Sequence, residues 1–110
     1  MALSKKNRLK KKKDFERVFR KGRAVNGSFL FIKFRPNSIG VPRIAFVISI
    51  KVSKKAVIRN KIRRILSEAA RLSFKEIPSY DIIVVANNKI VGVQKNEIRQ
   101  DLIGTLKKIK

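Results

Sequence analysis

The stretch DIIVVAN, residues 81–87, decides the fold of this chain. The five residues from Ile82 to Ala86 are all apolar, so a strand formed here carries apolar side chains on both faces. A strand with one face in water alternates apolar and polar residues, whereas a strand covered on both sides does not. Residues 81–87 therefore predict a central strand with other elements packed on both of its faces.

Two further strands are predicted before this run. Residues 28–35, SFLFIKFR, alternate between an apolar side and a mixed side of aromatic and basic residues. The apolar side holds Leu30, Ile32 and Phe34, and the mixed side holds Phe29, Phe31, Lys33 and Arg35. Proline, asparagine and glycine between residues 36 and 42 predict a turn, followed by a second strand over residues 43–52. The short connection predicts that the two strands form a hairpin.

Three helices complete the predicted order. A helix over residues 14–21 begins with Asp14 as its N-cap and ends before Gly22. Residues 55–74 and 93–108 carry apolar residues at helical spacing. The predicted fold class is therefore α+β, a single-domain α/β sandwich in the order α-β-β-α-β-α. Residues 1–13 are predicted to be a basic flexible arm, and residues 14–110 a single RNA-binding α/β domain for the reasons that follow.

The charge of the chain is strongly unbalanced. It has 29 lysines and arginines against 7 acids, for a formal net charge of +22. No acid occurs between Glu16 and Glu68, so nearly all of the excess lies in the first two thirds of the sequence. A compact domain that repels itself this strongly is typical of proteins that work beside a polyanion.

The absent residue types exclude most enzyme chemistry. The chain has no cysteine and no histidine, which removes thiolate nucleophiles, the usual zinc ligands and the commonest general base. The seven scattered carboxylates could in principle hold Mg²⁺, but no two sit in a recognisable metal-binding motif. No protein residue is therefore expected to be catalytic or to ligate a metal, and no organic cofactor is expected. No apolar run is long enough to cross a bilayer, and the basic start lacks the apolar segment of a secretory signal. The sequence predicts a cytoplasmic protein with no membrane partner.

Residues 51–64, KVSKKAVIRNKIRR, contain seven basic residues in fourteen and no acid. On a helix, one arc is apolar and the opposite arc is basic. The apolar arc is predicted to hold Ile58, Ile62, Ile65, Leu66, Ala69 and Leu72. Among the basic residues of this arc, only Arg64 has an acid four residues away, Glu68. The other positive charges would repel one another without a bound partner. This face therefore predicts contact with a nucleic-acid backbone, although physics alone does not say which one.

At these residues the chain resembles a known family. The run Arg59-Asn60-Lys61-Ile62-Arg63-Arg64 resembles the signature helix of the bacterial ribonuclease P protein subunit. Arg8-Leu9-Lys10 and the helix with Phe15 and Phe19 also resemble the opening of that family. Lys61 departs from the pattern, because the family often has arginine there; lysine keeps the charge but loses the fork geometry.

The resemblance implies a protein that binds the catalytic RNA of ribonuclease P and assists removal of the 5′ leader from precursor tRNA. The RNA and Mg²⁺, which the RNA mainly holds, would carry out the cleavage. One protein would bind each catalytic RNA. The resemblance assigns the contacts to the catalytic RNA to Lys51, Arg59, Asn60, Lys61, Arg63, Arg64 and Arg71.

The resemblance also implies a cleft between the first helix and the sheet that holds the single-stranded leader. Phe15 and Phe19 match its aromatic positions, and stacking on bases tolerates a variable sequence. From spacing alone, the two rings are more simply core residues. Periodicity favours the mixed face of residues 28–35 as the wall of the cleft, whereas the family alignment favours Leu30 and Ile32. We give the alignment the greater weight.

Three other functions compete with this interpretation. A structural ribosomal protein would share the small size, the basic arm and the α/β fold, and only the motifs at residues 59–64 and 15–19 separate the two. A protein nuclease is disfavoured by the lack of histidine and cysteine. A nonspecific DNA-binding protein would explain the charge but not the aromatic first helix.

Overall fold

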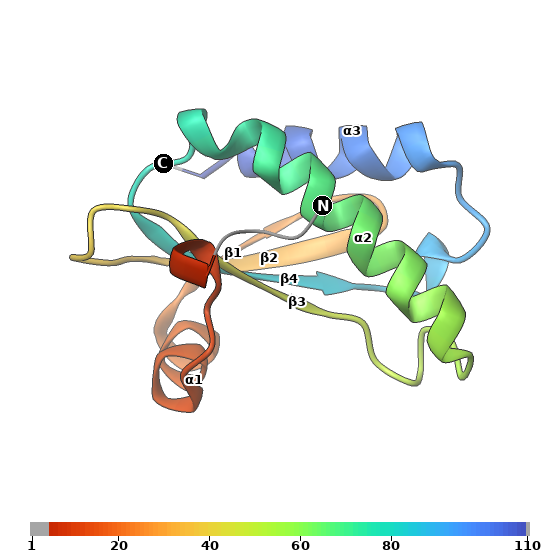
Figure 1. Cartoon of the computed structure of the whole chain (residues 1–110), viewed down its shortest axis with the longest axis horizontal. Coiled ribbons are helices and arrows are strands. Elements are labelled where there is room, and N and C mark those ends of the chain that lie inside the picture. The colour runs from red at the N-terminus through yellow and green to blue at the C-terminus, as the bar shows by residue number, and fades with distance from the viewer. Residues whose placement is uncertain (1–4, 110) are drawn as a thin grey trace.

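The computed structural model describes residues 5–109, which form a sheet with helices on both faces (Figure 1). The strands are β1 (Arg23–Asn26), β2 (Leu30–Pro36), β3 (Arg43–Val47) and β4 (Tyr80–Ala86), and the α-helices are α1 (Lys12–Lys21), α2 (Ala56–Ser73) and α3 (Lys95–Leu106). Short 3₁₀ helices span Lys5–Asn7, Phe74–Glu76 and Asn88–Ile90. The predicted α+β sandwich is confirmed, with one additional strand.

Strand β4 is the centre of the sheet. It lies between β2 and β3, antiparallel to β2 and parallel to β3. Helix α1 covers one face of the sheet, and α2 and α3 cover the other (Figure 1). Ile82, Ile83 and Val84 have no exposed surface, because consecutive side chains point to opposite faces and both faces are covered. The predicted central strand is therefore confirmed.

The predicted hairpin between residues 28–35 and 43–52 is wrong. In the sheet order β1-β2-β4-β3, β4 separates β2 from β3. Helix α2 instead links β3 to β4 as the crossover of a parallel pair, which buries its own apolar side on the sheet. This order gives the central place to the strand with two apolar faces. Strand β3 stands at the other side of β4 and ends at Val47 rather than at residue 52.

The strand that sequence reasoning missed is β1. Its four residues pair antiparallel with β2, from Arg23 opposite Phe34 to Asn26 opposite Phe31. It is short and mostly exposed, so it shows no clear alternation. The turn after it is held from α3, where the Asp101 carboxylate accepts hydrogen bonds from the backbone N–H groups of Ser28 (2.8 Å) and Phe29 (2.9 Å).

The boundary of the predicted flexible arm is also wrong. Residues 1–4 lie outside the described residues, but Asn7 and Leu9 attach residues 5–13 to the domain. Leu9 is only 6% exposed, and its backbone N–H donates to the carbonyl of Ile44 on β3 (3.0 Å). Asn7 donates from its side chain to the carbonyl of Pro42 (2.8 Å). Helix α1 begins at Lys12, and its N-cap is Lys11 rather than Asp14. Burial of the apolar Leu9 side chain lowers the free energy of the folded state, and this contact holds the basic segment against β3.

The core has two parts, one on each face of the sheet. The larger lies under α2 and α3, and the smaller joins Leu9, Val18 and Ile83 beneath α1. The apolar arc of α2 is rotated from the predicted one: Leu72 is 67% exposed, and Ala70 and Ser73 are buried instead. Between residues 5 and 109, every helix is too short or too polar to span a membrane.

Candidate nucleic-acid interface

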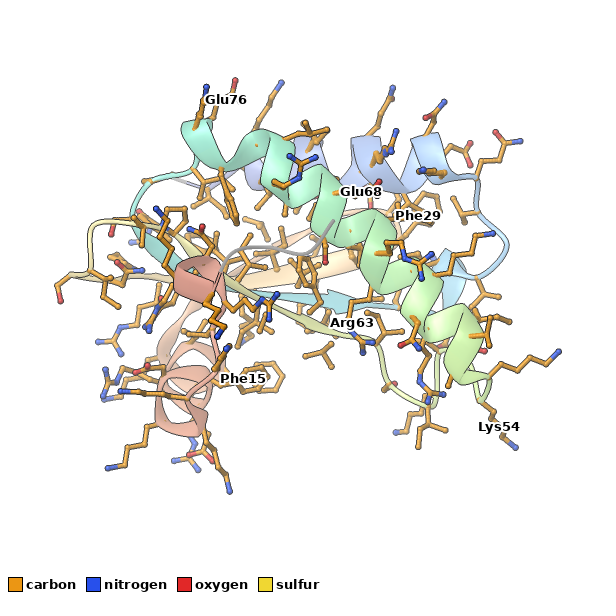
Figure 2. All side chains as sticks on the ribbon, in the orientation of Figure 1. Phe15, Phe29, Lys54, Arg63, Glu68 and Glu76 are labelled. Carbon is orange, nitrogen blue, oxygen red and sulfur yellow. The ribbon has the colours of Figure 1, made fainter. Side chains whose placement is uncertain are left out.

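The outward side of α2 and the loop before it form a continuous basic surface, which we call the α2 basic face. Its exposed residues are Lys51, Lys54, Lys55, Asn60, Lys61, Arg63, Arg64 and Arg71. Figure 2 shows Lys54 and Arg63 projecting from this part of the molecule. The structure thus brings together all but one of the residues expected to contact RNA; that one is Arg59.

Arg59 is half-buried and has a structural task. Its Nη1 donates to the backbone carbonyl of Ser53 (2.8 Å), which fastens the loop before α2 to the first turn of the helix. One turn later, Arg63 Nη1 donates to the side-chain oxygen of Asn60 (2.9 Å). Asn60 therefore holds the Arg63 guanidinium in a fixed direction on the exposed face. A guanidinium held in this way needs less ordering before it can bind a phosphate.

Glu68, the one acid of α2 (labelled in Figure 2), is engaged with α3. Its Oε2 accepts a hydrogen bond from Arg99 (3.2 Å) and lies 3.9 Å from Lys95 Nζ. The hydrogen bond from Arg99, together with the charge of Lys95, holds the pKa of Glu68 below its ordinary value. Glu68 is therefore ionised at neutral pH, and its negative charge is paired with the basic residues Lys95 and Arg99 of α3. The α2 basic face therefore keeps its positive charge for a partner.

Replacing Arg64 with alanine is expected to weaken RNA binding without harming the fold. Arg64 is exposed and forms no hydrogen bond or ion pair with any residue between 5 and 109. Its loss should change the free energy of unfolding by no more than about 0.5 kcal/mol. The log–log dependence of affinity on salt should flatten by about 0.7–0.9 if one phosphate contact disappears. Titration of the catalytic RNA at several salt concentrations measures both affinity and slope.

Lys75→Ala is the matched control, because Lys75 is an exposed cation that follows α2 and lies outside the α2 basic face. It removes the same charge and should leave the salt slope closer to that of the unmodified protein. Equal affinity and slope for Arg64→Ala and the unmodified protein would assign Arg64 to an ordinary solvated surface.

The second candidate surface is on α1. The rings of Phe15 and Phe19 meet with centroids 5.8 Å apart, and Lys33 Nζ lies 5.8 Å from the centroid of the Phe19 ring. We call these three residues the α1 aromatic surface. Phe15 packs on the smaller core, whereas Phe19 is 45% exposed. The two rings thus have different roles, since of the two only Phe19 is exposed, and a base could stack on its ring.

The prediction that Leu30 and Ile32 line a cleft beside the first helix is wrong. Their exposed fractions are 1% and 0%, and both pack in the larger core under α2 and α3. Residues at even positions of β2 face that core, so the odd positions, which include Lys33, face α1. The mixed face that periodicity favoured is therefore the one beside α1. Phe29 is an exception, because it precedes β2 and packs on the larger core (Figure 2).

An ion-pair network that the sequence did not predict attaches α1 to the sheet. Arg43 on β3 donates from Nε and Nη2 to both oxygens of Asp81 on β4 (2.8 and 2.7 Å), and Nη2 lies 3.3 Å from Asp14 on α1. The hydrogen bond to Asp81, with the charges of Asp81 and Asp14, raises the pKa of Arg43, so it remains charged. The three residues come from three elements, and no local sequence signal connects them.

A groove of about 380 Å³ joins the N-terminal segment to α2 along β3. Arg8 and Lys10 line one side of it, and Arg63 and Ser67 of α2 line the other. The basic residues before α1 therefore extend the α2 basic face, a relation that only the folded chain shows. Among residues 5–109, no three acidic side chains gather in a way that could hold a metal ion.

Comparison with known proteins gives one consistent result. A family model described as ribonuclease P matches residues 3–110. The ribonuclease P protein component of Alkaliphilus oremlandii is 36% identical over 104 residues, which cover 94% of this chain and 90% of that protein. The corresponding protein of Caldanaerobacter subterraneus is 32% identical, over 92% of this chain and 87% of its own length.

Solved structures agree with the sequence matches. An RNase P protein of Thermotoga maritima, in complex with 1-(4-fluorophenyl)-2-thiourea, superposes with a TM-score of 0.87 at 29% identity and covers 94% of this chain and 100% of its own. A Staphylococcus aureus RNase P protein mutant with defective mRNA degradation activity also has a TM-score of 0.87, at 31% identity, covering 94% of this chain and 87% of its own.

Proposed function

We propose, since this chain belongs to the ribonuclease P protein family, that it binds the catalytic RNA through the α2 basic face and the 5′ leader of precursor tRNA through the α1 aromatic surface. Family membership makes the chain an accessory subunit of the endoribonuclease that matures the 5′ end of tRNA. It also favours this function over that of a structural ribosomal protein, which the composition alone left open.

The observation that carries the first part of the proposal is the engagement of Glu68 with α3, which leaves the cations of α2 without an acid of their own helix. Phosphates of a folded RNA would neutralise these cations and release their counterions. The helix also presents arginine, whose planar guanidinium can bind a phosphate through two hydrogen bonds.

The second part of the proposal assigns the leader to Phe19. A leader is single-stranded and varies in sequence between precursors, so stacking suits it better than readout of base edges. Lys33 beside the ring supplies a cation for the leader backbone. One protein would serve one catalytic RNA.

Mg²⁺ enters the proposal through the RNA. Residues 5–109 offer no group of three acids for the ion, which supports a Mg²⁺ held mainly by the RNA. The protein would lower the Mg²⁺ requirement indirectly, because its cations reduce the repulsion between catalytic RNA and precursor tRNA that Mg²⁺ otherwise screens. The cytoplasmic location stays a prediction from the sequence.

Cleavage of precursor tRNA at low Mg²⁺ tests the proposal. The catalytic RNA with the protein should cleave at Mg²⁺ concentrations at which the RNA alone does not, and the protein alone should cleave nothing. Arg64→Ala serves as the internal comparison and should need more Mg²⁺ or more protein. Processing of precursor tRNA by RNA-free protein, after rigorous removal of contaminating ribonucleases, would contradict the proposal.

A further inference from the structure

Two grooves meet at Arg35 and Pro36, at the end of β2: the larger lies beside the side of α1 that faces away from Phe15 and Phe19, and the smaller reaches Phe34 and Tyr80, which pack on the larger core. At about 100° per residue, Arg17 and Lys21 lie on one side of the buried Val18, and the two rings lie on the other. The larger groove has a volume of about 580 Å³ and the smaller about 270 Å³. Both are lined by Arg35 and Pro36, so we call the pair the Arg35 trough.

The Arg35 trough is strongly basic. Its cationic lining residues are Lys11, Arg17, Lys21, Arg23, Arg35 and Arg43, and its acids are Asp14 and Asp81. Both acids are paired with Arg43, at 3.3 and 2.7 Å. Only Arg17 among the other cations approaches one of them, at 3.9 Å from Asp14. Most of the positive charge in the trough is therefore not neutralised by the protein.

Arg35 has a buried donor that no protein group satisfies in the described structure. It stands on β2 directly opposite Asp81, the partner that would be expected to neutralise it. Asp81 is already bound by Arg43 and by the side chain of Asn37 (2.9 Å). Arg35 Nη1 is buried and has no hydrogen-bond partner in the described structure. A buried donor without a partner is costly, and a turn of the Arg35 guanidinium toward a phosphate in the trough would remove that cost.

The far end of the trough offers an aromatic ring. Tyr80 lines the smaller groove and stacks on Phe34, with ring centroids 5.6 Å apart and an interplanar angle of 23°. Tyr80 is half-buried, and its stack on Phe34 holds the ring in place at the wall of the groove. A basic groove with an aromatic ring at its end is the combination that binds single-stranded nucleic acid.

We propose that the Arg35 trough is a second binding site for single-stranded RNA, separate from the α1 aromatic surface. Arg35 binds a backbone phosphate, with Arg23 and Arg17 on either side, and a base packs against Tyr80. The RNA is either the part of the leader farther from the cleavage site or an unpaired segment of the catalytic RNA, which present the same phosphodiester chemistry. This inference rests on the proposed function, since it takes RNA as the partner.

The test uses the full chain assembled with its catalytic RNA. The variants are Arg35→Gln and Arg23→Gln, and the control is Arg20→Gln, an exposed arginine of α1 outside the trough. Four affinities are measured: for the catalytic RNA, for precursor tRNA with a short leader, for precursor tRNA with a long leader, and for mature tRNA. Arg23 is exposed, so its variant folds even if Arg35→Gln does not.

Both variants should weaken one of these interactions about tenfold, as expected for a lost charged hydrogen bond, and lower its log–log salt slope by about 0.7. A loss confined to the long leader identifies the leader as the occupant, and a loss in binding the catalytic RNA identifies the catalytic RNA. Affinities of Arg23→Gln equal to those of Arg20→Gln throughout would overturn the proposal, whatever the behaviour of Arg35→Gln. If this proposal fails, the proposed function still holds as long as Arg64→Ala weakens binding of the catalytic RNA and Phe19→Ala weakens binding of precursor tRNA.

Discussion

Replacing Phe19 with alanine is expected to weaken the binding of precursor tRNA by roughly five- to 150-fold and to leave the binding of mature tRNA almost unchanged. The range corresponds to the loss of one stacked base, worth about 1–3 kcal/mol. The fold should tolerate the change, because Phe19 is 45% exposed while the neighbouring Val18, at 1%, secures the helix to the sheet. Affinities of the holoenzyme for both tRNAs, with thermal unfolding of the protein, measure the effect.

Val18→Ala is the matched control on the same helix. It should lower the free energy of unfolding by about 1–3 kcal/mol, since it empties part of a buried site. Any effect of that destabilisation on RNA binding should be shared by precursor and mature tRNA. Equal losses for the two tRNAs in Phe19→Ala would mean that Phe19 contributes only packing, and the leader site would have to lie elsewhere.

Replacing Gly22 with alanine is expected to destabilise the protein by about 1–3 kcal/mol, the usual cost of overpacking. Gly22 joins α1 to β1, and an added Cβ would lie within 3.0 Å of the backbone oxygens of Val18 and Phe34. Backbone atoms held by the helix and the sheet cannot move aside as a flexible side chain can. The melting temperature should fall by roughly 4–8 °C for each kcal/mol.

Gly104→Ala provides the opposite result with the same chemical change. Gly104 lies in α3, and a Cβ added there would meet nothing within 4 Å. Alanine is favoured over glycine in a helix by about 1 kcal/mol, so this variant should be more stable. Thermal unfolding of the two variants side by side separates the local clash from the general effect of adding a methyl group. Similar melting temperatures for both would contradict the tight contact at Gly22.

The features that could be predicted from sequence are those that neighbouring residues encode. The apolar run at residues 81–87 predicted a covered central strand, and β4 is that strand. The spacing of apolar and basic residues over residues 55–74 predicted α2 and its exposed arginines, because the helical period alone places them on opposite sides. The motif at residues 59–64 carried the family resemblance for the same reason, since all of its residues belong to one helix.

The features that were missed depend on residues far apart in the chain. Periodicity placed Leu30 and Ile32 on one face of a strand and Lys33 on the other, but it could not say which helix covers which face. Residues 23–26 became β1 because β2 and the Asp101 carboxylate hold that hairpin, not because of their own pattern. The segment at residues 5–13 was predicted to be flexible because most of its residues are charged. Leu9 becomes buried only when the folded chain brings β3 beside it.

The sequence by itself determined the fold class, the central strand, the basic helix and the kind of partner. Each of these follows from composition or from a period of two or 3.6 residues, and such signals act within a single element. Only the tertiary structure decided that β4 separates β2 from β3 and that Arg43 joins α1 to the sheet. It also decided that Arg35 lies beside Asp81 while Arg43 binds that carboxylate. These outcomes come from competition among distant groups for the same partner, and the folded chain is the first state in which those groups meet.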